Sequence, residues 1–241
     1  MEENVFDRIE KKYLITERQK KALLAIIKKN LSKDKYYKSE VYNLYFDNQN
    51  YDLIDQSINW TDFKEKLRAR SYGGYDRVFL EIKTKIREKE NNIGYKRRVM
   101  ITHKDFDKFI KKTATLEDLA KKQVEKNNDI QIAKEIDYLI GTFNLEPKIL
   151  VIYNRESYKN ENGLRITFDE NLRYRNKNLR LISMNSDKMY FKGSQNIIME
   201  IKAHGSLPLW LVQKLSEQKI YPKQFSKIGN IYQKIRKEQN V

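Results

Sequence analysis

The sequence predicts an α+β protein in which eight antiparallel strands form a β-barrel tunnel with a basic lumen and with helices packed outside. Three observations predict this fold. Runs of β-branched and aromatic residues recur along the chain, short turns such as Tyr72–Tyr75 separate several of them, and Lys and Arg alternate with apolar residues within them. Short connections favour antiparallel pairing, and about eight strands are needed before a barrel encloses a small ligand.

The composition is that of a folded, strongly basic protein. The chain has 241 residues, with 49 Lys and Arg against 33 Asp and Glu, so its formal net charge is +16. Sixteen Tyr and ten Phe supply bulk for a core, which argues against general disorder. Because no Ser-, Gly- or Pro-rich linker interrupts the chain, we expect one domain spanning residues 1–241. The charge indicates an anionic partner: nucleic acid, phosphorylated small molecules or a lipid surface.

Residue types that are missing exclude several kinds of chemistry. The chain has no Cys and only two His, His103 and His204, so a thiolate or imidazole metal site and a His-centred triad are not expected. A metal would have to be held by carboxylates, which favours Mg²⁺ or Mn²⁺. The longest apolar run, Ala22–Ile27, is far shorter than the ~20 residues of a membrane helix. Without a secretory signal in the first residues, a cytoplasmic location is expected.

Helices are predicted by caps and by apolar spacing. Thr16 and Gln19 form a capping-box pattern ahead of Leu23, Leu24, Ile27 and Leu31. A second helix is expected near Ile132–Ile140, with Gly141 at its C-terminal cap. Pro208 can open a third, with Leu211, Val212 and Leu215 on one face. Further helices are expected within His103–Asn127 and over roughly Ile228–Lys237.

Strand-type runs fill the remaining chain. They are Phe6–Ile15, Glu40–Phe46, Phe63–Tyr72, Arg77–Lys85, Ile93–Thr102, Lys148–Tyr158, Leu164–Phe168, a weaker pair near Leu172–Ile182 and Lys188–Phe191, and Ile197–Ala203.

Charged residues within these strands share a face. Successive side chains of a strand point to opposite sides, so Lys64, Lys66, Arg68 and Arg70 lie opposite Phe63, Leu67 and Ala69, with Glu65 as the exception. The same parity groups further residues within their own strands: Glu81, Lys83 and Lys85; Lys96 and Arg98; Arg165 and Thr167; Glu200 and Lys202; Arg8, Glu10 and Lys12.

Two interpretations fit this pattern. One is an ordinary solvated sheet face. The other is a lumen that closes around a polyanion, which explains why cations so outnumber carboxylates although like charges on facing strands repel. Phosphate suits the second interpretation, because Arg presents a planar fork and Lys a point charge. The chain has no glycine-rich phosphate loop, so side chains would have to hold the phosphates.

Carboxylates on the same faces allow for a metal. Glu10, Glu81 and Glu200 could hold a divalent ion that bridges phosphate oxygens, although Glu81 could instead pair with a neighbouring cation. Crowding of positive charge also leads us to expect that removing Arg68 or Arg70 leaves the melting temperature unchanged or raises it. Lys20 and Lys21 are expected on the solvated side of their helix.

An ordered set of motifs resembles a known family. RIEKKYLI (Arg8–Ile15), KLRARSYG (Lys66–Gly73), VFLEIKTK (Val78–Lys85), YKRRV (Tyr95–Val99), YNRESY (Tyr153–Tyr158), LRITFD (Leu164–Asp169), IMEIK (Ile198–Lys202) and FSKIGN (Phe225–Asn230) resemble the polyphosphate polymerase domain of the vacuolar transporter chaperone family. The resemblance is to bacterial stand-alone members. That family belongs to the triphosphate tunnel metalloenzymes. The related CYTH-type members begin with ExExK, whereas Arg8 stands here for the first Glu, which favours the polymerase branch.

The resemblance implies a fold, an activity and a set of residues. It implies a tunnel in which a metal-dependent polymerase transfers the γ-phosphate of ATP onto inorganic polyphosphate. Carried over by motif, the catalytic residues are Arg68, Arg70, Lys83, Arg155 and Arg165; the phosphate-binding residues are Lys12, Lys96, Arg98, Lys202 and Lys227; and the ligands of Mn²⁺ or Mg²⁺ are Glu200 and, more weakly, Glu10. A membrane-protein partner is possible in such a family, although the sequence does not reveal one.

Alternatives remain open at this point. The same tunnel could serve a triphosphatase, with water in place of the phosphate acceptor, or a non-catalytic binder of polyphosphate or nucleic acid. Stable nucleic-acid binding is not expected, because the basic residues lie on inward strand faces and no RNA-recognition, KH or zinc-finger pattern is present. Lys12, Lys83 and Lys227 could also be ordinary surface lysines.

Overall fold

The computed structural model describes residues 8–59, 61–73, 76–88, 91–122, 127–181 and 187–239. Within these ranges the strands are β1 (Arg8–Ile15), β2 (Ser32–Asp47), β3 (Phe63–Tyr72), β4 (Val78–Glu88), β5 (Asn91–Ile101), β6 (Glu146–Lys159), β7 (Arg165–Arg175), β8 (Lys188–Met189) and β9 (Ile197–His204). The helices are α1 (Glu17–Asn30), α2 (Asp52–Ile58), α3 (His103–Ile110), α4 (Leu116–Lys121), α5 (Asn127–Phe143), α6 (Leu209–Glu217) and α7 (Lys227–Gln239).

The described strands form one sheet, which confirms the α+β class. Their hydrogen-bonded order is β1-β9-β7-β6-β2-β3-β4-β5, with β8 paired to β7. The pairings of β1 with β9, β7 with β9, β2 with β3, β3 with β4 and β4 with β5 are antiparallel, as expected. Between the described strands this order runs from β1 to β5 without joining these two, so a closed tunnel remains a prediction.

The chain divides into two compact units. The first contains Met1–Glu40, Ile152–Arg173 and Met189–Ser226, and the second contains Val41–Val151, Tyr174–Lys188 and Lys227–Val241. Strands β2, β6, β7 and β8 each contribute residues to both units. The expectation of a single domain stays a prediction.

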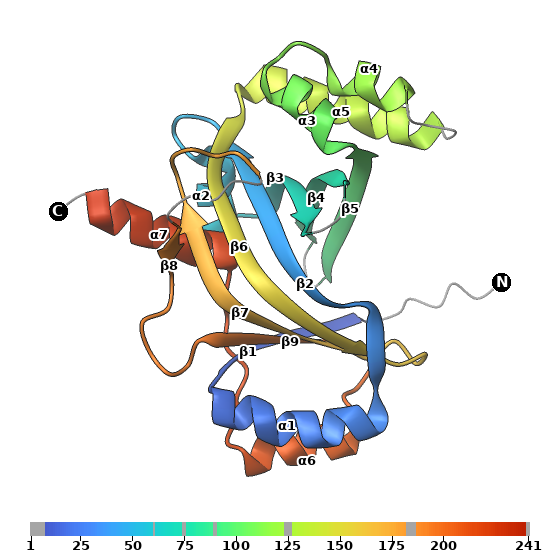
Figure 1. The fold of residues 1–241 in the computed structure, drawn as a ribbon, viewed down its shortest axis with the longest axis vertical. Coiled ribbons are helices and arrows are strands. Elements are labelled where there is room, and N and C mark those ends of the chain that lie inside the picture. The colour runs from blue at the N-terminus through green and yellow to red at the C-terminus, as the bar shows by residue number, and fades with distance from the viewer. Residues whose placement is uncertain are drawn as a thin grey trace. The chain divides into compact units, whose positions relative to one another are not determined.

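In the first unit, α1 and α6 cover the apolar side of the sheet (Figure 1). Leu23 and Ile27 of α1 and Leu211 of α6 are buried with Met199 and Ile201 of β9 in one cluster. The capping box at Thr16 and Gln19 starts α1 as predicted, and Pro208 precedes α6. Each fully buried side chain of this size contributes about 1.5–3 kcal/mol by leaving water, so these helices hold the sheet from one side and leave its other side to the polar residues.

In the second unit, β3, β4 and β5 form a meander whose residues alternate in burial. Leu67 and Ala69 of β3, Leu80 and Ile82 of β4 and Val99 of β5 are buried. Glu65, the expected exception to the parity, is also buried, and its carboxylate accepts a hydrogen bond from the Thr84 hydroxyl at 2.9 Å. In contrast, Phe63, predicted on the apolar face, is exposed at the first position of β3. Helices α3, α4 and α5 lie together in the same unit (Figure 1).

Side-chain carboxylates start two helices of the second unit. The Asp47 carboxylate accepts hydrogen bonds from the backbone N–H groups of Leu53 and Ile54 in α2. The Asp137 carboxylate does the same for Leu116 and Glu117 in α4. Both satisfy N–H groups that have no partner inside their helix.

Several predicted elements differ from the observed ones. The predicted strand Glu40–Phe46 is the end of the longer β2, the runs predicted at Leu164–Phe168 and near Leu172 are one strand, β7, and α2 was not predicted. Gly141 is not a cap: α5 continues to Phe143, and Asn144 adopts the left-handed conformation with φ 50°. Val212 is 45% exposed, so only Leu211 and Leu215 face the core. Phe6, Asp7, the turn residues Gly74 and Tyr75, residues 123–126 of the predicted helix His103–Asn127, and Ile182 lie outside the described residues. Among the described helices, none has the length and apolar content needed to cross a membrane.

Candidate functional site

The predicted site residues other than Lys227 lie on polar sheet faces, some in each unit. In the second unit, Lys66, Arg68 and Arg70 of β3, Lys83 of β4, and Lys96 and Arg98 of β5 share one face, which we name the basic ladder. In the first unit, Glu10, Lys12, Arg165, Glu200 and Lys202 share a face, and Arg155 joins it through its ion pair with Asp169 of β7; we name this the Glu200 face. Lys227 is the first residue of α7 in the second unit, and its predicted contact with phosphate stays a prediction.

Strand register places the basic ladder in rows. Lys66 lies opposite Lys83, which lies opposite Lys96. In the next row, Arg68 lies opposite Glu81, which lies opposite Arg98. Like charges on facing strands repel each other, so a carboxylate in the middle of this ladder reduces the repulsion among its cations.

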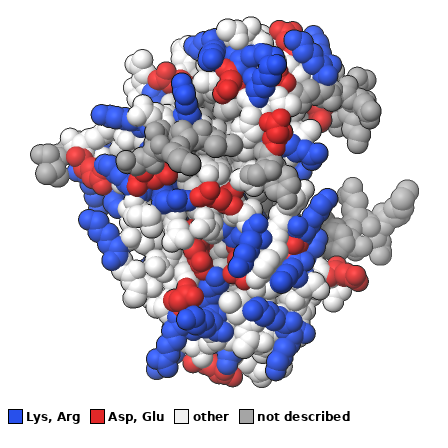
Figure 2. Space-filling view, viewed as in Figure 1, with Lys and Arg blue, Asp and Glu red and all other residues white. Residues whose placement is uncertain are grey.

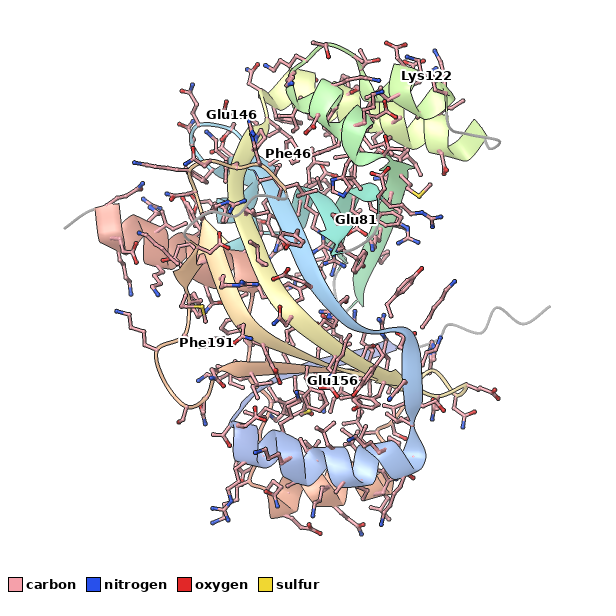
Figure 3. All side chains as sticks on the ribbon, in the orientation of Figure 1. Phe46, Glu81, Lys122, Glu146, Glu156 and Phe191 are labelled. Atoms are coloured by element: carbon pink, nitrogen blue, oxygen red, sulfur yellow. The ribbon has the colours of Figure 1, made fainter. Side chains whose placement is uncertain are left out.

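Glu81 is the carboxylate in the middle of the ladder, and its side chain is buried (Figure 3). Its side chain is 2% exposed. One oxygen accepts from Arg68 Nε at 2.8 Å and lies 2.7 Å from Arg68 Nη2, and the other lies 2.6 Å from Lys96 Nζ. Burial raises the pKa of Glu81, but the charges of Arg68, Arg70 and Lys96 outweigh it and hold the pKa at about 2. Glu81 is therefore ionised. Its two carboxylate oxygens are already in contact with Arg68 and Lys96, and these contacts hold both cations in position.

This geometry reverses one expectation from the sequence. Removing Arg68 would not simply relieve repulsion, because it would deprive the buried Glu81 carboxylate of its closest guanidinium. Breaking a buried ion pair from one side leaves a charge without compensation. We therefore expect loss of Arg68 to lower stability, contrary to the prediction from charge crowding.

Two neighbours fix the remaining orientation of the ladder's arginines. Arg70 Nε donates to Asn43 Oδ1 at 2.8 Å, and Asn43 in turn donates to the backbone carbonyl of Val151. Arg68 also donates to the Tyr45 hydroxyl at 3.3 Å. Burial raises the pKa of Tyr45, but the positive charges of Arg68, Lys66 and Arg70 outweigh this effect and lower the pKa to about 8. Arg98 behaves differently, since its guanidinium lies over the Phe79 ring at 4.8 Å from the centroid.

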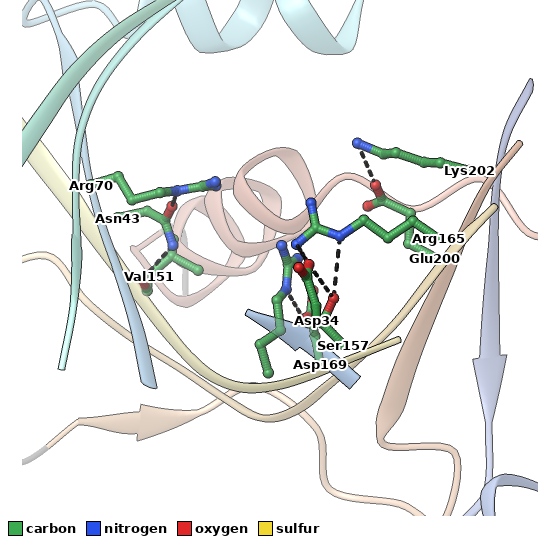
Figure 4. Close-up of polar contacts among 10 residues, drawn as sticks. Asp34, Asn43, Arg70, Val151, Ser157, Arg165, Asp169, Glu200 and Lys202 are labelled. Carbon is green, nitrogen blue, oxygen red and sulfur yellow. Dashed lines mark hydrogen bonds and ion pairs between the residues drawn. The ribbon is translucent and has the colours of Figure 1, made fainter. Parts of the chain in front are cut away.

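On the Glu200 face, carboxylates and ammonium groups alternate. Lys202 Nζ lies 2.8 Å from Glu200 (Figure 4). It also lies 3.5 Å from Glu10, and Lys12 Nζ lies 3.5 Å from Glu10. The register puts Lys12 opposite Glu200 and Glu10 opposite Lys202. The sequence-predicted residues of β1 and β9 are thus brought together, as the parity of each strand indicated.

Each of the two arginines on this face is held by an aspartate that sequence reasoning missed. Arg155 makes two hydrogen bonds to the fully buried Asp169, at 2.7 and 2.8 Å. Arg165 lies 2.9 Å from Asp34 and donates to the Ser157 hydroxyl at 3.2 Å (Figure 4). Burial raises the pKa of the Asp34 carboxyl, but the Lys35 N–H group and the Arg165 charge outweigh it and lower that pKa. Asp169 shares its parity with Arg165 and Thr167, a signal that could have identified it; Asp34 lies in the part of β2 that was not predicted.

Lys20 corrects another expectation. It was expected on the solvated side of α1 but is buried, with Nζ 2.9 Å from Glu156 and in contact with Glu170. His204 is exposed, and its ring lies so close to Gly163 that a Cβ at position 163 would meet it at 2.1 Å. Gly163 also has a φ of +80°, and this left-handed backbone conformation favours glycine in the turn between β6 and β7.

The carboxylates suit a hard cation that takes most of its ligands from a substrate. Within the described residues, no group of three or more His, Asp or Glu side chains converges on one point as a metal site would require. Glu10 and Glu200 offer two carboxylates from neighbouring strands. Mg²⁺ is commonly bound by one or two carboxylates together with phosphate oxygens and water, so this donor set fits such an ion.

Comparison with known proteins decides the family. The profile of the VTC domain matches residues 7–235. The chain belongs to the VTC domain family. The family expected from the motifs is thereby confirmed.

Three solved structures match most of the VTC-family chain at low sequence identity. A putative adenylyl cyclase from Hippeastrum, reported to have a dominant triphosphatase activity, has a TM-score of 0.53 at 16% identity, over 92% of this chain and 93% of that one. The PH1819 protein of Pyrococcus horikoshii has a TM-score of 0.46 at 14% identity, over 94% and 99%. A putative adenylate cyclase from Vibrio parahaemolyticus has a TM-score of 0.49 at 10% identity, over 94% and 98%.

Proposed function

We propose that this VTC-family chain is a metal-dependent polyphosphate polymerase that transfers the γ-phosphate of ATP onto a growing polyphosphate chain. The observation that carries the proposal is the basic ladder. Its cations occupy three adjacent strands and share their face, among the described residues, with one carboxylate of those strands, Glu81. Such a concentration of Arg and Lys suits a polyanion with closely spaced charges.

The chain's own residues bind and orient the phosphates. A terminal oxygen of polyphosphate attacks the γ-phosphorus, and the bond from that phosphorus to the bridging oxygen of ADP breaks in line with it. Phosphate charge is neutralised in the second unit by the guanidinium groups of Arg68 and Arg70 and the ammonium group of Lys83, and in the first unit by the guanidinium groups of Arg155 and Arg165. Because the acceptor is itself a phosphate, no covalent intermediate on the protein is required.

The remaining predicted residues have supporting tasks. Lys12, Lys96, Arg98, Lys202 and Lys227 bind the flanking phosphates, and fixed contacts such as Asp34 with Arg165 and Asn43 with Arg70 keep the cations oriented before substrate arrives. An Mg²⁺ or Mn²⁺ ion held by Glu200 and Glu10 would supply further charge neutralisation at the phosphate oxygens.

A triphosphatase is the second candidate. It would use the same cations, with water in place of the polyphosphate acceptor. The observation that favours it is the triphosphatase activity reported for the Hippeastrum protein, whose fold is similar. The non-catalytic binder remains the third. We also propose a cytoplasmic location, with ATP and polyphosphate as the partners and nucleic acid excluded.

Product analysis separates these candidates. The protein is incubated with ATP and Mg²⁺ or Mn²⁺, and polymer, ADP and orthophosphate are measured. Polymer together with ADP is the expected result; orthophosphate without polymer indicates the triphosphatase, and no turnover indicates a binder. Glu200→Gln should abolish metal-dependent turnover with the fold intact, whereas Glu217→Gln, an exposed glutamate of α6, should have no effect. Full activity of Glu200→Gln with an unchanged metal requirement would remove Glu200 from the site.

A further inference from the structure

One end of the basic ladder is aromatic. Beyond the row of Arg68, Glu81 and Arg98, the next row places Arg70 opposite Phe79 and Phe79 opposite Met100. Tyr72 meets Phe79 edge-on, with ring centroids 6.3 Å apart and an interplanar angle of 75°. Phe79 and Tyr72 are half-buried and Met100 is 36% exposed, so this end of the polar face presents apolar surface where the other rows present charge.

Arg98 joins this aromatic end. Its guanidinium lies 4.8 Å from the centroid of the Phe79 ring, diagonally across from β4 to β5. In the part of the chain that the structure describes, this is the contact that Arg98 makes, and it forms no ion pair there. Arg68 and Arg70 differ, because each donates hydrogen bonds to an acceptor fixed in the sheet.

A guanidinium over an aromatic ring is a surface on which a nucleobase stacks. Bases bind to proteins by stacking on aromatic side chains and on the planes of Arg guanidinium groups, and this stacking tolerates different bases because every base has a π-face. Inorganic triphosphate and polyphosphate have no flat apolar part, so stacking on such a surface adds nothing to their binding affinity. A nucleoside triphosphate has a flat base, which suits the aromatic end of this face, and a triphosphate, which suits its basic rows.

We propose that Phe79 and Arg98 form a nucleobase platform, which makes the protein select a nucleoside triphosphate over inorganic triphosphate as its phosphate donor. The proposal rests on the proposed function, since it takes the basic ladder as the phosphate site. Rows of the ladder are two residues apart along the strands, about 6.6–6.8 Å. With the base on the platform, the phosphates extend along the row of Arg68 and Arg98 towards the row of Lys66, Lys83 and Lys96.

Arg98 thereby acquires a different task from the one its motif implies. The family resemblance, and with it the proposed function, makes Arg98 a phosphate ligand, whereas we now infer from its guanidinium lying over the Phe79 ring that it stacks on the base instead. Tyr72 holds the Phe79 ring from its edge. No hydrogen bond to a base edge enters the proposal, so the platform should discriminate weakly among ATP, GTP and CTP and strongly against donors without a base.

Binding of two probes to matched variants tests the platform. ATP and inorganic tripolyphosphate are titrated calorimetrically into the wild-type protein and into Phe79→Leu, which keeps an apolar side chain but removes the ring. We expect Phe79→Leu to weaken ATP binding about 5- to 150-fold, as loss of base stacking does, with tripolyphosphate affinity within about twofold of wild type. Phe79→Tyr, which retains the ring, should restore ATP binding.

A second variant covers the case in which Phe79→Leu fails to fold. Arg98→Lys keeps the positive charge but loses the guanidinium plane, so it should lower the affinity for ATP more than that for tripolyphosphate. Equal losses for both probes, or no loss for either, would overturn the platform while leaving the phosphate site in place. A wild-type protein that binds neither probe would instead overturn the proposed function.

Discussion

At Glu81, burial and charge act in opposite directions, and the balance decides what neighbouring residues can do. Removing a carboxylate from water is costly unless cations and hydrogen bonds replace the solvent. Arg68 and Lys96 provide that replacement at 2.6–2.8 Å. The same contacts hold both cations in the ladder before any phosphate is present, so Glu81 links stability to the organisation of the proposed site.

The first prediction compares two arginines of one row. Arg68→Ala should lower the free energy of unfolding by about 1.5–3 kcal/mol, the range for a charge-assisted hydrogen bond lost at a buried partner. Arg98→Ala should cost under about 1 kcal/mol, because a cation–π contact at an exposed site is worth about 0.5–1 kcal/mol. Urea unfolding measures both. Equal stability of the two variants would show that Glu81 does not depend on Arg68.

The second prediction concerns pH. The pKa of Glu81 is lowered in the folded state from 4.5 to about 2, so its stabilising contribution is present above the unfolded pKa and is lost as the pH falls towards about 2. This drop corresponds to about 3 kcal/mol at neutral pH. Glu81→Gln should therefore unfold more easily than wild type at pH 7, and the difference should shrink below about pH 4.5. Thermal unfolding across this range measures it; a constant difference would contradict the assignment.

At the scale of elements, α1 is joined to the sheet by more than its apolar stripe. The Lys20 ammonium lies between Glu156 of β6 and Glu170 of β7 (Figure 3 labels Glu156). Glu156 also accepts hydrogen bonds from the hydroxyls of Tyr37 and Tyr158. Burial raises the pKa of Glu156, but these hydroxyls and Lys20 outweigh it and hold that pKa at about 2. Charged residues on β6 and β7 thus occupy both faces of the sheet.

The third prediction uses adjacent lysines of α1. Lys20→Met should destabilise the protein by about 2–3 kcal/mol, less than the 3–5 kcal/mol of a fully buried pair, because Glu170 remains partly exposed. Lys21→Met, on the exposed side of the same helix turn, should stay within about 0.5 kcal/mol of wild type. Chemical denaturation of both variants checks the assignment. If the two were equally stable, Lys20 would be a surface lysine after all.

For the whole molecule, the net charge of +16 governs encounters with polyanions. On the face drawn in Figure 2, Lys and Arg side chains are spread over the surface and are not confined to one patch. Non-specific attraction will therefore accompany any specific binding. Salt separates the two contributions only when binding is compared between anions of different shape.

The fourth prediction makes this comparison. Polyphosphate should bind tightly, and the logarithm of its affinity should fall linearly with the logarithm of salt concentration, because Lys and Arg release counterions from the polymer. Double-stranded DNA should bind more weakly at physiological salt, since it is too wide for a tunnel of about eight strands. Fluorescence anisotropy over a salt series measures both. Similar affinities for the two polymers would contradict the tunnel.

The sequence by itself determined which face of a strand each residue occupies, because that depends only on the alternation of the backbone. Parity placed Arg68 and Arg70 opposite Leu67 and Ala69, and the spacing of Thr16 and Gln19 fixed the start of α1. The family could be identified because its motifs occur in the expected order along the chain. These signals are local, so one strand or one helix turn contains all the information they need.

Only the tertiary structure decided which charges meet. The partners of Arg155 and Arg165 are Asp169 and Asp34, and Asp34 stands more than a hundred residues away from Arg165 in the chain. In the sequence, Lys20 does not differ from its neighbour Lys21. In the structure, Glu156 and Glu170 of the sheet form ion pairs with Lys20. A pattern in one segment cannot reveal a carboxylate that another strand supplies, since pairing between distant strands is set by the burial of apolar faces across the whole sheet.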